Sequence, residues 1–213
     1  SIERRLALLT STHPGDAGAV AEGCRAVTEL ASDHDYAHLL SSRDLVGEVQ
    51  EAMNFHPHDP ALQEACVLAL WQVCTVPARA AAYVRRLVRA GGVQTLLRTL
   101  HLHPAHPAVQ DLACRALAAL MEEEAGRAEA VTQGVPAAAI AAIHAFQHDP
   151  DVLEQAARVL VAMARDASLR RGLDQAGAVG SVMELLGAPG SDVRVREQGC
   201  LVLLALAEGG GVE

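Results

Sequence analysis

The sequence contains no lysine among its 213 residues and a single asparagine, Asn54. Every reaction that needs a lysine side chain is therefore excluded, including Schiff-base catalysis and the lysine of a phosphate-binding loop. Aromatic residues make up 2% of the chain, whereas residues of the hydrophobic class make up 51%. Leucine, valine and alanine must therefore fill the interior, and their small side chains permit close packing of helices.

Short catalytic motifs are also missing. The sequence has no Gly-x-Ser-x-Gly nucleophile elbow, no His-Glu-x-x-His zinc motif, no glycine-rich phosphate loop and no protein-kinase signature. Gly91 and Gly92 fall at a corner between two expected helices, where backbone geometry accounts for them. The sequence therefore predicts a protein without enzymatic activity and without a cofactor.

The charge balance limits the classes of partner and compartment. The net charge is −9 and the isoelectric point lies near 5.5, so we expect neither nucleic acid nor an anionic membrane as a partner. The sequence has no signal segment and no uninterrupted apolar run long enough to cross a membrane. We expect a cytoplasmic protein, although the sequence does not distinguish the cytoplasm from the nucleus.

Cysteines and histidines show no metal-ligand pattern. The odd number of cysteines, the absence of Cys-x-x-Cys spacing and their mostly apolar surroundings predict buried, reduced thiols at Cys24, Cys66, Cys74, Cys114 and Cys200. Seven histidines precede the expected long helices, at His56, His58, His101, His103, His106, His144 and His148. We expect these histidines to form a solvated edge, because no closed set of metal ligands accompanies them.

Internal repetition is the most informative feature of the chain. Similar segments occupy residues 62–70, 109–117, 152–160 and 195–203, and a looser copy occupies 19–31. Successive equivalent positions are 43, 47, 43 and 43 residues apart, at Ala26, Ala69, Ala116, Val159 and Val202. Such a period is typical of helical solenoids with two or three helices in each repeat. We therefore expect one domain of about five repeats over residues 1–213.

Helix boundaries recur within each repeat. A capping residue precedes the last helix of the four strong repeats, at Asp59-Pro60, His106-Pro107, Asp149-Pro150 and Ser191-Asp192. A corner of small residues precedes the helix before it, at 90–93, 133–136 and 176–179. Each unit is therefore expected to contain a short helix, a second helix and a long helix. The long helices are expected near 19–31, 61–74, 108–121, 151–164 and 193–207.

The order Ala-Gly-Gly-Val, Leu-Leu-x-x-Leu, a loop with proline, then Val-Gln-Asp-x-Ala-Cys-x-Ala-Leu resembles armadillo repeats. The resemblance covers residues 36–207. HEAT repeats are the runner-up, because they share the helical stacking but lack the glycine corner. The resemblance implies an all-α fold, a right-handed α-solenoid in which the long third helices line a concave groove. It also implies that a partner segment binds in that groove.

Armadillo proteins that bind extended peptides carry tryptophan and asparagine at set places of the third helix. The tryptophan place is filled here by Arg25, Leu68, Arg115, Arg158 and Leu201. The asparagine place is filled by Glu29, Gln72, Ala119, Ala162 and Ala205. Only Gln72 could replace an asparagine rung, so recognition of basic peptides in the manner of importins is disfavoured. Trp71 adjoins Gln72, and either packing or ligand stacking would account for it.

The three arginines at the tryptophan place have two interpretations. Arg25, Arg115 and Arg158 could bind an acidic or phosphorylated segment, because guanidinium holds carboxylate and phosphate groups bidentately. Alternatively, each arginine pairs with an acid about one turn away, at Glu22, Asp111 or Glu154. Leu68 and Leu201 would add apolar contacts in the groove.

These observations predict a protein–protein interaction scaffold that binds a partner segment in the groove. The alternative is a structural, regulatory or self-associating array within a larger multidomain protein, because residues 195–206 form an apolar helix with no visible repeat after it. Binding of a phosphorylated lipid head group or nucleic acid is a weaker alternative, opposed by the net charge. The chain lacks an initial methionine, and we expect it to be part of a longer protein.

Overall fold

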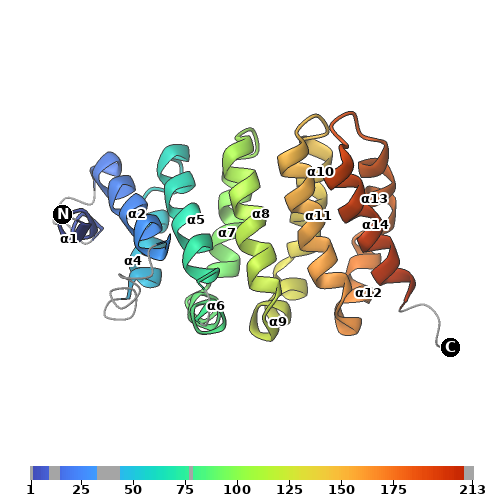
Figure 1. Cartoon of the computed structure of the whole chain (residues 1–213), viewed down its shortest axis with the longest axis horizontal. Helices are drawn as coiled ribbons and strands as arrows, with labels where there is room; N and C mark the ends of the chain where they lie inside the picture. The colour runs from blue at the N-terminus through green and yellow to red at the C-terminus, as the bar shows by residue number, and fades with distance from the viewer. Residues whose placement is uncertain (1, 10–14, 33–43, 77–78, 209–213) are drawn as a thin grey trace.

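The computed structural model describes residues 2–9, 15–32, 44–76 and 79–208. Within these ranges it contains thirteen helices and no strand. The helices follow one another along a single axis from α1 (Ile2–Leu6) to α14 (Val193–Ala207), as Figure 1 shows. This arrangement confirms the expected all-α solenoid.

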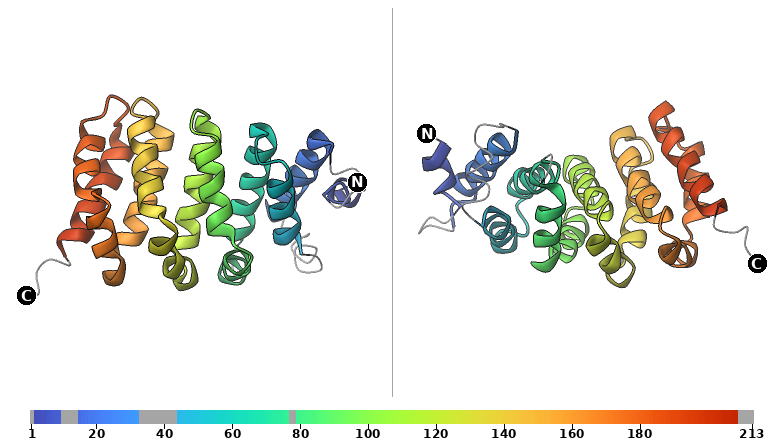
Figure 2. Two further views of the ribbon diagram at one scale, coloured as in Figure 1. Left: turned by 180° about the vertical axis from the view of Figure 1, so that it is seen from behind. Right: turned by 60° about the horizontal axis from the view of Figure 1, so that its bottom comes forward.

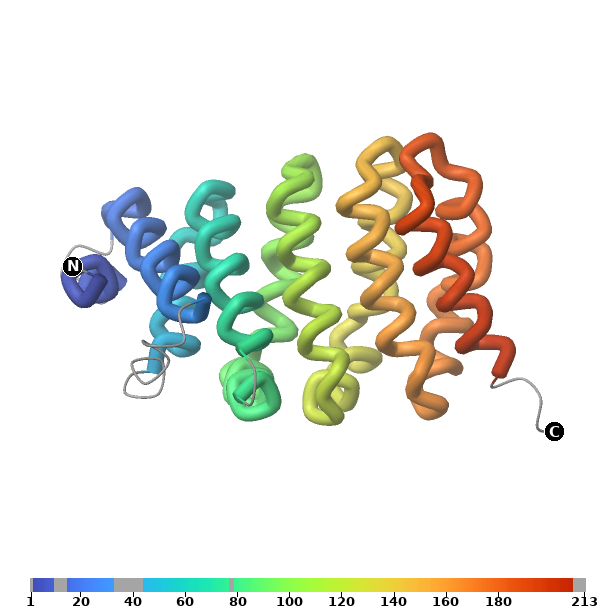
Figure 3. The backbone as a smooth tube through the Cα atoms, viewed as in Figure 1, coloured from blue at the N-terminus to red at the C-terminus, as the bar shows by residue number. Residues whose placement is uncertain are grey.

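Five long helices form one side of the molecule, here called the long-helix face (Figure 1 and Figure 3). Each long helix packs against the next one in chain order, α2 on α5, α5 on α8, α8 on α11, and α11 on α14. The long helices overlap the ranges expected from the sequence: α2 (Ala17–Ser32), α5 (Pro60–Cys74), α8 (Pro107–Met121), α11 (Pro150–Ala164) and α14.

Apart from α1, which lies at the N-terminal end beside α2 (Figure 1), the remaining helices lie behind or below the long-helix face, as the view from behind in Figure 2 shows. A helix of intermediate length precedes each of the last four long helices: α4 (Leu45–Phe55), α7 (Gly92–Leu102), α10 (Val135–Ala145) and α13 (Ala178–Gly187). Three helices lie along the lower edge in Figure 1: α6 (Ala80–Arg89), α9 (Glu124–Gln133) and α12 (Ala167–Gln175). The last three repeats therefore have the expected order of three helices.

Side-chain caps begin three of the long helices as predicted. Asp59, Asp149 and Asp192 accept backbone N–H groups in the first turns of α5, α11 and α14. These bonds satisfy donors that a helix cannot satisfy internally. His106 precedes Pro107 at the start of α8, but its side chain makes no capping hydrogen bond.

The glycine corners have the predicted left-handed backbone. The φ angles of Gly91, Gly134 and Gly177 are 80°, 82° and 80°. A side chain is strained in this region, whereas glycine adopts it freely. The equal angles turn the chain in the same way before α7, α10 and α13, so the long helix of each of these repeats is set at an equivalent place.

Two buried glutamines connect helices within a repeat. The Gln63 amide donates to the carbonyls of Met53 and His56 at 2.9 and 3.0 Å, at the end of α4. The Gln110 amide makes equivalent bonds to Leu100 and His103 at 2.8 and 3.1 Å, at the end of α7. Both amides satisfy carbonyl groups that the preceding helix leaves without an internal partner.

The cysteines correct two expectations. Cys24 and Cys66 form a disulfide between α2 and α5, with Cα atoms 5.1 Å apart, so these two are not reduced thiols. They come together because α2 and α5 pack side by side, which their separation of 42 residues did not reveal. Cys74 and Cys114 are buried as predicted, and burial raises each thiol pKa to about 12. Cys200 is exposed rather than buried.

The repeat register predicts that Ala116→Asp unfolds the array. Ala116 is 2% exposed between packed helices, and a carboxylate there would have no cation to pair with. We expect a loss of about 3–5 kcal/mol in the free energy of unfolding, measured by urea denaturation. Ala108→Asp, at an exposed place in the first turn of the same helix, is the matched control. Equal stability of the two variants would show that the register is wrong.

The disulfide predicts a specific pattern of thiol reactivity. Protein denatured without reductant should be alkylated at Cys74, Cys114 and Cys200 only. Reduction should lower the free energy of unfolding by about 2–4 kcal/mol, because the cross-link no longer constrains the unfolded chain. A double variant with alanine at Cys24 and Cys66 should not respond to reductant. Mass spectrometry that finds all five cysteines alkylated before reduction would exclude the disulfide.

Candidate functional site

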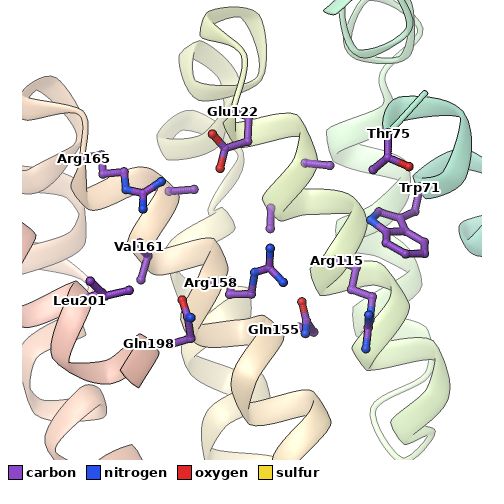
Figure 4. Close-up of a pocket in the computed structure, with 13 residues that line it drawn as sticks. Trp71, Thr75, Arg115, Glu122, Gln155, Arg158, Val161, Arg165, Gln198 and Leu201 are labelled. Atoms are coloured by element: carbon purple, nitrogen blue, oxygen red, sulfur yellow. The ribbon is translucent and has the colours of Figure 1, made fainter. Parts of the chain in front are cut away.

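A hollow of about 400 Å³ opens on the long-helix face, between side chains of α5, α8, α11 and α14 (Figure 4). We call it the long-helix pocket. Six of the ten residues predicted for the groove line it: Trp71, Arg115, Ala119, Arg158, Ala162 and Leu201. The same place of successive long helices therefore contributes to one continuous surface, as the 43-residue period indicated.

Four predicted residues lie outside the pocket. Leu68 and Gln72 are half-buried on α5, and neither lines the hollow. Arg25 and Glu29 lie on α2, where both form ion pairs. The Nε atom of Arg25 is 2.9 Å from a carboxylate oxygen of Glu22. The carboxylate of Glu29 is 2.6 Å from the guanidinium of Arg5, which belongs to α1.

Arg5 connects α1 to the acids of α2. Its guanidinium also lies 2.6 Å from Glu22, so one arginine contacts two carboxylates. The hydrogen bond from Arg5 lowers the pKa of Glu29, and the one from Arg25 lowers the pKa of Glu22. These acids are therefore held in the charged form, and Arg25 has the internal partner that the second interpretation expected.

Arg115 is held by two neighbours within the pocket wall. Its Nε atom lies 3.0 Å from Asp111, one turn earlier on α8. Burial raises the pKa of Asp111, while the hydrogen bond from Arg115 opposes this rise. The guanidinium carbon lies 5.6 Å from the centre of the Trp71 ring, which is a cation–π contact. Trp71 therefore both packs and lines the pocket.

Arg158 differs from the other two arginines. Its expected partner Glu154 instead lies 2.9 Å from Arg194, on the next long helix. Across the described ranges, Arg158 has no carboxylate within 4.0 Å. Pairing one turn away thus holds for Arg25 and Arg115 and fails for Arg158.

The pocket contains polar residues that were not predicted from the sequence. Glu122, Gln155, Arg165 and Gln198 all line it. Helical periodicity could have identified two of them, because residues 155, 158, 162 and 165 share one face of a helix. Sequence reasoning followed only the two places of the peptide-binding motif, so it missed the residues one turn before and after them.

The seven histidines expected at a solvated edge do not all lie at the surface. His103 is 3% exposed, and its Nε2 atom lies 2.8 Å from the carbonyl oxygen of Pro57, so it does not belong to a solvated edge. The other six histidines of this set are exposed or half-buried.

In the parts of the chain that are described, no group of three or more metal-ligating side chains comes together. The described helices include none with the length and apolar character to span a membrane.

Comparison with known proteins identifies the fold. A designed armadillo repeat protein superposes with a TM-score of 0.82 at 15% identity, over 99% of this chain and 84% of that one. An engineered protein superposes with a TM-score of 0.80 at 24% identity. The superposition covers 98% of this chain and 48% of the engineered protein, so this chain spans about half the length of that protein. A second engineered protein has a TM-score of 0.69 at 21% identity, over 98% and 97% of the two chains.

Comparisons of the amino-acid sequence find no match. No family model matches the chain, and no curated protein matches it. The helices, the glycine corners and the structural neighbours nevertheless agree. The chain thus has an armadillo-like repeat fold.

Proposed function

We propose that the chain is a protein–protein interaction module that binds a segment of a partner protein along its long-helix face. The observation that carries this proposal is the long-helix pocket, where four consecutive long helices contribute side chains to one hollow. The side chains offer apolar, aromatic and charged contacts from Leu201, Trp71 and Arg158. A standard protein–protein interface buries about 800 Å² of accessible surface on each partner. Part of the long-helix face is long enough to supply this area.

The same reasoning assigns the pocket to binding rather than catalysis. Its lining includes three arginines and two glutamines that offer hydrogen bonds, and its described residues include no serine, cysteine, histidine or lysine that could form a nucleophile–base pair. We infer a protein that takes no cofactor or metal and does not act on nucleic acid or membranes, in keeping with its net charge of −9.

We propose a cytoplasmic location, which one cysteine feature favours and another opposes. The exposed free thiol of Cys200 suits a reducing compartment, whereas the disulfide of Cys24 and Cys66 suits an oxidising one.

A steric block in the pocket tests the binding function. Ala119→Tyr places a large ring on the half-buried wall of the pocket, and Ala128→Tyr places the same ring on exposed surface of α9. We expect peptides selected from a random library against the parent chain to bind Ala119→Tyr at least about tenfold more weakly. They should bind Ala128→Tyr normally in fluorescence anisotropy. If thermal melting shows both variants folded and both bind equally, the long-helix pocket is not the binding site.

A second candidate function is self-association through the outer side of α13 and α14. Leu204 is 56% exposed, whereas Val161, one 43-residue step earlier, is 5% exposed. Met183 is 59% exposed, whereas Ile140 at the equivalent place is 8% exposed. In the preceding repeat, α14 packs against α11, which carries Val161, and α13 packs against α10, which carries Ile140. We propose that a second copy of the chain covers Leu204 and Met183, because the surface has the apolar character of the interfaces between repeats.

Light scattering tests this second function. The parent mass should rise from 22.3 kDa toward about twice that value as concentration increases. Leu204→Glu should keep the chain monomeric, because a dimer would bury the new charge. Val131→Glu changes an exposed apolar residue on α9 and is the control. A parent that stays monomeric at all concentrations would contradict self-association.

A further inference from the structure

The arginines of the long-helix face differ in whether a carboxylate already holds them. Arg25 is paired with Glu22 at 2.9 Å, and Arg115 with Asp111 at 3.0 Å. Arg158 lines the long-helix pocket, and no described carboxylate lies within 4.0 Å of it. Because a guanidinium stays charged at every accessible pH, Arg158 presents a positive charge that the chain itself does not pair.

The reason for this difference lies on the neighbouring helix. Glu154 precedes Arg158 by four residues, a spacing at which the two would normally pair. Arg194 lies 2.9 Å from Glu154 and 3.2 Å from Asp151, and also contacts Asp192 at 3.0 Å. The Glu154 side chain is 14% exposed in this network, so it is fixed toward α14. Arg194 therefore acts as a positioning residue that leaves Arg158 available.

Gln155 is a second, independent sign of a ligand. Gln155 is 2% exposed, yet it lines the pocket. Its amide makes no hydrogen bond to any described residue, whereas the amides of Gln63 and Gln110 each donate to two carbonyls. Figure 4 shows Gln155 beside Arg158, in the space between α11 and α8. Because Gln155 lines the hollow and its amide is not paired within the described protein, the amide is available to pair with a ligand bound there.

We propose that Arg158 and Gln155 form a subsite for an anionic side chain, a carboxylate or a phosphate ester, carried by the segment that docks on the long-helix face. This inference rests on the proposed binding function and adds the chemistry of the partner. The guanidinium donates two parallel N–H groups to the anion, and the Gln155 amide donates a third. Arg115, held over Trp71, contributes positive charge from the adjacent wall.

The position of Glu122 fixes which end of the pocket receives the anion. Glu122 is the one acid among the lining residues, and Figure 4 shows it on the side of Arg165, away from Gln155. An anion beside Arg165 would face this carboxylate, whereas an anion beside Arg158 would not. The net charge of −9 repels acidic partners at long range, so recognition depends on these short contacts and should weaken as salt increases.

Matched peptides test the inference. Nine-residue peptide libraries with glutamate, phosphoserine or glutamine fixed at the centre would be titrated against the full chain by fluorescence anisotropy. We expect the glutamate or phosphoserine library to bind at least about tenfold more tightly than the glutamine library at low salt. Comparing the two anionic libraries distinguishes a carboxylate ligand from a phosphate ligand.

Three variants locate the effect. Arg158→Gln should abolish the preference for the anionic centre, and Arg25→Gln, which changes a paired arginine outside the pocket, should retain it. Arg194→Gln should weaken the preference although it lies outside the pocket, because Glu154 becomes free to pair with Arg158. Thermal melting checks that each variant is folded. A preference unchanged in Arg158→Gln would overturn the subsite.

The outcomes separate the two proposals. Binding that Ala119→Tyr blocks, but with equal affinity for glutamine and glutamate centres, would overturn the anionic subsite and leave the docking function standing. Absence of any peptide whose binding depends on Ala119 would overturn both. Binding to phosphatidylserine vesicles in place of peptides, abolished by Arg158→Gln, would assign the anion to a lipid and overturn the peptide ligand.

Discussion

The close approach of successive long helices is the constraint on which the rest of the structure depends. One small or β-branched residue recurs at the same place of each helix, and these residues are at most 2% exposed: Ala26, Ala69, Ala116, Val159 and Val202. A solenoid has no single closed core, so its stability depends mainly on such contacts between neighbours. Because each helix is placed by the one before it, the side chains of the outer surface also recur at regular positions.

This regularity explains why much of the fold could be predicted from the sequence. The 43-residue period, the aspartate caps and the left-handed glycines are local signals, and each recurs in several repeats. The disulfide between Cys24 and Cys66 was not predictable in this way, because it joins side chains at different places of their repeats. The burial of His103 was missed for a similar reason, since its partner Pro57 lies in the preceding repeat.

The candidate site was predictable only in part. Repeat register placed Arg115 and Arg158 on the same face, and in the structure both line the long-helix pocket. The repeat register could not show which of these arginines forms an ion pair with a carboxylate of the chain. That outcome depends on Arg194, which contacts Glu154 from the next helix, and repeat equivalence does not reveal such a competition. The repeat period thus predicts where an arginine lies, whereas contacts between neighbouring repeats decide whether its guanidinium is free to bind a ligand.

The uniqueness of Trp71 provides the most direct test of this account. Trp71 is the sole tryptophan of the chain and lines the pocket beneath Arg115, so its emission reports on that site alone. The measurement is Trp71 fluorescence during titration with a glutamate-centred peptide that contains no tryptophan. The account predicts a saturable change that follows the binding curve obtained by anisotropy. Peptide binding that saturates without altering Trp71 emission would contradict docking in the long-helix pocket.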